Sequence, residues 1–133
     1  RRLKMVDFIV ECLESERVAL YFQPIVDLRK GGKTYPISRY EVLMRMITRD
    51  GKVVPPAEIM SAAEDFGLNT RIDLHIAQRA IQMIKDWRSK GKDIALTINL
   101  SGLTFDDQEA MDKIGVMLEQ AKLDPGHVVF EIT

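Results

Sequence analysis

Three segments of this sequence alternate between large apolar residues and smaller or polar ones, the pattern of β-strands whose two faces differ. They span residues 40–46, 94–100 and 128–133. The even-numbered positions are apolar in each, whereas the odd-numbered positions include Glu41, Asn99 and Glu131. One face of each strand can therefore pack against helices while the other turns polar groups inward, as in a (β/α) barrel.

The connections between these segments limit how the strands can pair in the sheet. Residues 94–133 read as strand, helix over 106–121, then strand, so the two strands should be parallel with a right-handed crossover. An earlier strand over residues 18–28 contains Pro24, which places it at a sheet edge or at a bulge. Gly31 and Gly32 mark a turn from it into the 40–46 strand, which predicts an antiparallel hairpin.

Apolar periodicity predicts three more helices. One covers about residues 3–15, a short one begins at Pro55-Pro56 and ends at Gly67, and a longer one ends at Gly91. Asn69 or Thr70 is expected to cap the longer helix.

Length and charge limit the function classes. At 133 residues with a net charge of −1, the chain fits one domain and has no positive field to attract a nucleic acid polymer. The single cysteine, Cys12, cannot form an internal disulfide, which favours a packing role in a reducing, cytoplasmic environment. A parent protein could still be attached to the inner membrane through segments outside this chain.

Glu41, Asn99 and Glu131 form the first candidate site. All three lie on the odd-numbered strand faces, so a barrel would bring two carboxylates and an amide oxygen together. Such oxygen ligands without His or Cys favour Mg²⁺ or Mn²⁺ over zinc. Other interpretations remain open: Glu41 could be solvated, Asn99 could cap the following helix, and Glu131 could pair with a lysine.

Arg45 lies on the same face as Glu41, and its planar guanidinium is suited to binding a phosphate. The histidines, His75 and His127, lie in a helix and a turn and are interpreted as surface or packing residues. Asp106-Asp107 is interpreted as charge at a helix N-terminus.

The candidate site residues, with several further motifs, resemble the amino-terminal half of the domain that defines the EAL family, bacterial phosphodiesterases that hydrolyse cyclic di-GMP to pGpG. The resemblance covers about residues 18–133, with valine in place of the alanine of the Glu-Ala-Leu signature. Its motifs are Tyr21-Phe22-Gln23-Pro24-Ile25-Val26-Asp27, Glu41-Val42-Leu43 followed by Arg45, Pro56-Ala57-Glu58, Ala63-Glu64, Gly67-Leu68, Asn99-Leu100-Ser101 and Glu131-Ile132-Thr133.

The resemblance implies an α/β fold, a partial TIM-like (β/α) barrel of about half the full barrel with an antiparallel first strand. Residues 1–17 would be a connector helix and residues 18–133 the amino-terminal half of the domain. The resemblance further implies metal ligation by Glu41, Asn99 and Glu131, phosphate contact by Arg45, and substrate contact by Gln23 and Leu43.

The same resemblance implies that further metal ligands and a catalytic lysine lie beyond Thr133. We therefore expect the parent to be a cyclic di-GMP phosphodiesterase and the isolated fragment to be inactive. The alternative is a catalytically silent EAL domain that acts as a cyclic di-GMP receptor or protein-interaction module. An upstream GGDEF or sensor domain is compatible with the family, and an uncovered strand edge would favour a homo-oligomer.

Overall fold

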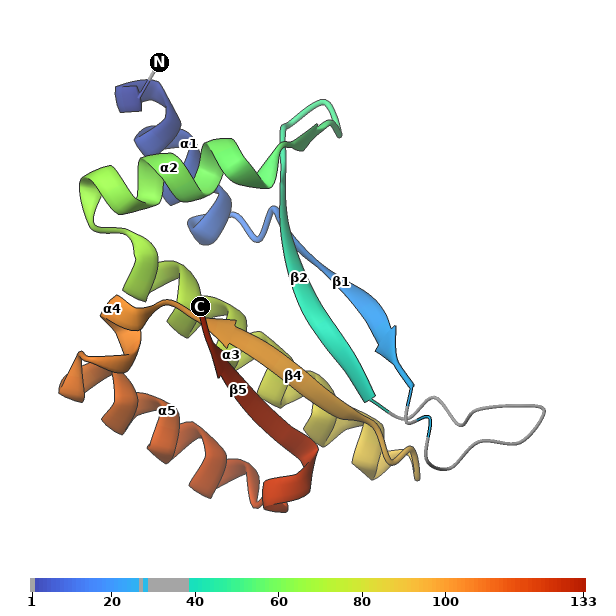
Figure 1. Ribbon diagram of the computed structural model, residues 1–133. Coiled ribbons are helices and arrows are strands. Elements are labelled where there is room, and N and C mark those ends of the chain that lie inside the picture. Colours follow the sequence, from blue (N-terminus) through green and yellow to red (C-terminus); the bar gives the residue numbers. More distant parts are fainter. Residues whose placement is uncertain (1, 27, 29–38) are drawn as a thin grey trace.

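The computed structural model describes residues 2–26, 28 and 39–133, and it shows a mixed α/β fold built on one twisted sheet (Figure 1). The elements in chain order are α1 (Arg2–Glu14), β1 (Val18–Ile25), β2 (Arg39–Ile47), β3 (Val53–Val54), α2 (Pro56–Phe66), α3 (Asn69–Ser89), β4 (Ala95–Leu100), α4 (Gly102–Phe105), α5 (Gln108–Ala121), the 3₁₀ turn η2 (Pro125–His127) and β5 (Val128–Ile132).

The sheet has the order β1-β2-β4-β5, with the short β3 paired to β2. β1 runs antiparallel to β2, whereas β4 runs parallel to both β2 and β5. The predicted antiparallel first strand and the βαβ unit are therefore confirmed. Pro24 lies opposite Tyr40 in an unbroken register on the edge strand, so the strand is not bulged there. The predicted turn residues Gly31 and Gly32, and also Asp27, lie outside the described residues.

The even-numbered side chains of the strands form the core, as their alternation predicts. In β4, Leu96, Ile98 and Leu100 are fully buried, and in β2 Val42 is 4% exposed. The edge strand joins this core through Phe22, whose ring makes an edge-on contact with Trp87 of α3 at 5.8 Å between centroids. We call this helix-covered side of the sheet the outer face, and the side of the odd-numbered residues the inner face.

Helix α2 begins and ends as predicted. Pro56 occupies its first turn, where no amide donor is needed, and Gly67 ends it in a left-handed conformation with φ of 69°.

The predicted cap of the next helix is wrong. Leu68 already has helical backbone angles and its carbonyl accepts from the Ile72 amide, so α3 takes in Asn69 as its first residue. The tight turn from α2 decides the helix start, and Asn69 is buried at 4% exposure.

The helix predicted over residues 106–121 is α5, which begins at Gln108 and ends at Ala121, and the short α4, which was not predicted, precedes it. Ser101 caps the short α4 and Asp107 caps α5, where its carboxylate accepts from the Ala110 amide at 3.1 Å. Asp107 therefore stabilises a helix N-terminus, in agreement with its interpretation from the sequence.

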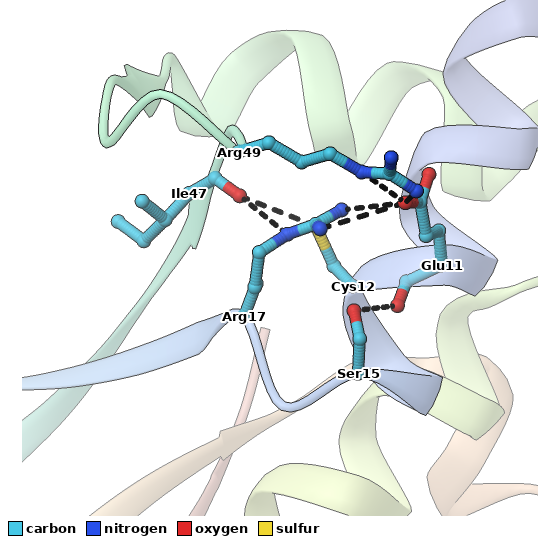
Figure 2. Close-up of polar contacts among 6 residues, drawn as sticks. All are labelled: Glu11, Cys12, Ser15, Arg17, Ile47 and Arg49. Atoms are coloured by element: carbon cyan, nitrogen blue, oxygen red, sulfur yellow. Dashed lines mark hydrogen bonds and ion pairs between the residues drawn. The ribbon is translucent and has the colours of Figure 1, made fainter.

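Helix α1 is fastened to the end of β2 by a polar cluster (Figure 2). Glu11 accepts from Arg49 and forms an ion pair with Arg17 at 3.2 Å, while Arg17 Nε donates to the Ile47 carbonyl at 3.2 Å. These hydrogen bonds, first from Arg49 and then from Arg17, lower the pKa of Glu11. Cys12 is fully buried beside them, and its burial raises the pKa of the thiol.

Because Ile9, Cys12 and Leu13 of α1 belong to the main core, this helix packs as part of the fold. Its role as a connector from a preceding domain stays a prediction. Among the described residues, no helix has the length and apolar character needed to cross a membrane.

Candidate functional site

Two of the three predicted metal ligands are in direct contact. The Asn99 side-chain amide donates to a carboxylate oxygen of Glu41, with 3.0 Å between Nδ2 and Oε2. Both side chains are half-buried on the inner face. Ser101 is the residue that caps the following helix, so the alternative role of Asn99 as a helix cap is wrong.

The contact bridges a place where the sheet opens. The β2–β4 pairing runs from Arg39 opposite Ala95 to Glu41 opposite Thr97. Beyond that point Figure 1 shows β2 curving away from β4 toward α1 and α2. Asn99, two residues after Thr97 on the same face, therefore reaches back to Glu41 across the start of the gap.

Glu131 lies on the next strand, opposite Asn99 in the β4–β5 register, and is exposed. The fold thus carries the predicted ligands on one face of three neighbouring strands. Two carboxylates and an amide oxygen are hard donors that suit Mg²⁺ or Mn²⁺. No group of three or more His, Cys, Asp or Glu residues able to hold a metal occurs in the part of the chain that the structure describes. Because Mg²⁺ and Mn²⁺ prefer about six oxygen ligands, three side chains would fill only part of such a shell.

A cleft of about 250 Å³ occupies the gap between the separating strands. It combines polar groups from the strand ends with apolar groups from the helices, and it is shared by three of the predicted site residues. The lining residues that bear on function are Leu43, Arg45, Asp73, Asn99, Ser101 and Thr133.

Arg45 is held in a defined position beside this cleft. Its guanidinium lies 5.4 Å from the centre of the Tyr21 ring and donates to the Met44 carbonyl at 2.8 Å. Arg45 is half-buried, and among the described residues it forms no ion pair with a carboxylate. Its remaining donors are therefore available to an anionic ligand.

Gln23 lies farther from the cleft than the other predicted residues. It is the register partner of Glu41 on the edge strand β1 and is exposed there, but it does not line the cleft. The residues that lie opposite one another across the four strands are Gln23, Glu41, Thr97 and Val129. Asn99 and Glu131 form the next pair on the same face, nearer the carboxyl ends of β4 and β5.

The histidines and the cysteine lie away from this site. His127 Nε2 is 2.5 Å from Asp93 Oδ1, and these residues precede β5 and β4, at the opposite end of the strands. His75 is half-buried on α3, where desolvation lowers its pKa. The interpretation of both histidines as surface or packing residues agrees with these positions.

Sequence reasoning missed Asp73 of α3, which lines the cleft at 7% exposure. Its carboxylate accepts from the Ser101 amide at 2.9 Å and from the Thr104 hydroxyl at 2.6 Å. An acid directly after Ile72 in an apolar helical stripe was the available signal, because a buried carboxylate requires partners.

Comparison with known proteins gives consistent matches to one family. The EAL domain family matches residues 8–133. Signaling protein YkoW of Bacillus subtilis (strain 168) is 31% identical over 123 residues, covering 92% of this chain and 15% of that protein. Cyclic di-GMP phosphodiesterase PdeB of Shewanella oneidensis is 30% identical over 125 residues, covering 94% of this chain and 14% of that protein.

Among solved structures, the FimX EAL domain from Pseudomonas aeruginosa bound to c-di-GMP aligns with a TM-score of 0.82 at 31% identity. The alignment covers 96% of this chain and 49% of the FimX chain. The chain thus spans about half of that domain structure and a much smaller part of the curated relatives.

Proposed function

Because this chain belongs to the EAL domain family, we propose that it forms the amino-terminal half of a domain that hydrolyses cyclic di-GMP to linear pGpG. The observation that carries the proposal is the contact between Glu41 and Asn99 beside a cleft that also holds Arg45. Potential metal ligands and a potential phosphate-binding arginine therefore lie at the same cleft. The name of PdeB, a cyclic di-GMP phosphodiesterase, supports the same substrate.

The proposed metal ligands are Glu41, Asn99 and Glu131. A bound Mg²⁺ or Mn²⁺ would supply Lewis acidity toward the phosphodiester. The chain's own contribution is to hold two carboxylates and an amide on one face of the sheet. A bound cation would also offset the negative charge that Glu41 and Glu131 place on the same sheet face.

Arg45 is the proposed phosphate contact. Its contacts with Tyr21 and the Met44 carbonyl restrict the guanidinium before substrate arrives, so less conformational entropy is lost on binding. Leu43 would offer an apolar wall to the nucleotide, and Gln23 an amide at the edge strand.

A receptor without catalysis is the second candidate. The FimX EAL domain, 31% identical to this chain, was solved with c-di-GMP bound, so a domain of this shape can hold the dinucleotide. Such a receptor needs Arg45 and Leu43 but not the metal ligands.

The decisive test uses the full-length protein that carries this chain. Purified protein is incubated with cyclic di-GMP and Mg²⁺ or Mn²⁺, and pGpG is measured by chromatography with and without a chelator. We expect pGpG that disappears with the chelator. Dinucleotide binding without any pGpG would overturn the hydrolase and support the receptor.

The isolated chain should behave differently from its parent. We expect the 133-residue chain alone to produce no pGpG, because three ligands leave the shell incomplete. We also propose that it self-associates, since Val129 and Ile132 of the edge strand β5 are 42% and 47% exposed. Robust hydrolysis by the chain, or a monomer at high concentration in sedimentation, would contradict these expectations.

A further inference from the structure

Asp73 is a buried carboxylate that the proposed reaction does not use. It is 7% exposed, and it pairs with no Lys, Arg or His in the described part of the chain. A buried charge without a cation is costly unless strong hydrogen bonds compensate it. Asp73 has two such bonds, both to a single oxygen, Oδ2.

Both bonds hold the turn that follows β4. The first comes from the backbone amide of Ser101, which is two residues after Asn99. The second comes from the fully buried hydroxyl of Thr104, which also contacts Ser101 Oγ at 3.0 Å and Thr70 Oγ1 at 3.3 Å. The start of α3 is thereby joined to the carboxyl end of β4.

The contacts of Asp73 lie at the end of β4 that is not paired with β2. The β2–β4 pairs end at Glu41 opposite Thr97, so Asn99 lies where the strands separate. At this end, β4 still pairs with β5 on one side. On the other side its pairing with β2 has already ended, and the hydrogen bond from the Ser101 amide to Asp73 replaces it.

We propose that Asp73 is a positioning residue that fixes the turn at Ser101–Thr104 and so sets the Asn99 amide within hydrogen-bond distance of Glu41. The inference deepens the proposed function, on which it rests for the role of Asn99 as a metal ligand. Groups that orient ligands in this way commonly affect metal affinity or activity 10–100-fold, roughly.

The test reads the position of Asn99 directly. The Asn99 side-chain amide signals are recorded by ¹H–¹⁵N NMR of the full-length protein that carries this chain, folded and without metal or nucleotide. They are assigned by their loss in Asn99→Asp. We expect Asp73→Ala and Thr104→Val to shift both signals beyond the spread of the controls. Asp73→Asn and Thr104→Ser retain an oxygen at each position and should keep the signals near the wild-type position.

Asp112→Ala is the matched control. Asp112 is an exposed acid on α5 that accepts from Gln108 at 2.8 Å within its own helix, so its loss should leave Asn99 unmoved. Wild-type Asn99 signals in folded Asp73→Ala would overturn the proposal. If that variant does not fold, wild-type signals in Thr104→Val would overturn it equally.

A second readout separates this inference from the proposed function. In the full-length protein, Asp73→Ala should lower kcat/KM for cyclic di-GMP about 10–100-fold, with Asp73→Asn recovering part of it. If the wild-type protein makes no pGpG, the hydrolase proposal fails, while the Asn99 signals still decide the role of Asp73. Shifted signals with unchanged kcat/KM would overturn its effect on the reaction.

Discussion

The two faces of the sheet differ in what covers them. On the outer face, Leu96, Ile98 and Leu100 are completely buried under helices. On the inner face, Tyr21 and Val129 are 46% and 42% exposed, and the polar candidates lie among them. Successive strand residues point to opposite faces of the sheet. In each strand, therefore, one set of residues stabilises the fold and the alternate set carries the candidate site.

The largest expected effect is on the outer face. Ile98→Ala should lower the free energy of unfolding by about 2–5 kcal/mol, because it removes buried methyl groups and leaves a cavity. Val129→Ala, on the exposed inner face, should change it by less than about 0.5 kcal/mol. Denaturant unfolding of both variants measures the contrast, and equal losses would contradict the division between the faces.

The next effect is on ligand binding at the inner face. Arg45→Gln in the full-length protein should weaken binding of cyclic di-GMP about 10–100-fold, since a charge-assisted hydrogen bond contributes about 1.5–3 kcal/mol. Binding is measured by calorimetry with the chelator present, which prevents hydrolysis. Arg88→Gln, which removes an exposed arginine on α3, is the control. Unchanged affinity in Arg45→Gln would remove Arg45 from the phosphate site.

The sequence was sufficient to predict which residues share the inner face. A strand has a period of two, so Glu41, Asn99 and Glu131 could be assigned to one side before their strands were placed. The parallel pairing of β4 and β5 could also be predicted, because a βαβ unit joins two parallel strands.

Features that depend on tertiary contact could not be predicted in this way. Asp73 binds groups 28 and 31 residues away, a pairing that no local spacing reveals. The start of α3 is set by its tight turn from α2, which overrides the capping preference of Asn69. The end of the β2–β4 pairing at Glu41 opposite Thr97 is also a tertiary feature, and so is the hydrogen bond from Arg17 to the Ile47 carbonyl at the far end of β2.

A smaller effect on stability is expected from His75 of α3 as the pH falls. Burial lowers the pKa of His75 below its unfolded value of 6.5, so the folded protein favours the neutral ring. Stability from this residue is complete above pH 6.5 and is lost as pH falls through the lower folded pKa. His75→Leu should therefore reduce the drop in Tm between pH 7.5 and pH 5. An unchanged drop would show that His75 does not cause it.

The smallest effect concerns Glu11, which is exposed enough for solvent to weaken its ion pairs. Arg49 and Arg17 lower its pKa below the unfolded value of 4.5. Its contribution is present above pH 4.5 and disappears as pH falls through the folded pKa. The Tm difference between wild type and Glu11→Gln should thus be small at pH 7 and vanish at pH 3. A difference that grows in acid would contradict this sign.

The most direct test of the two-face account compares neighbours on β2, Glu41 and Val42, in the full-length protein. Glu41→Gln should lower pGpG formation at least about 100-fold and change the free energy of unfolding by less than about 1 kcal/mol. Val42→Ala should instead cost about 2 kcal/mol of stability and preserve the activity of the folded molecules. Full activity in Glu41→Gln, or losses of both kinds in both variants, would contradict the account.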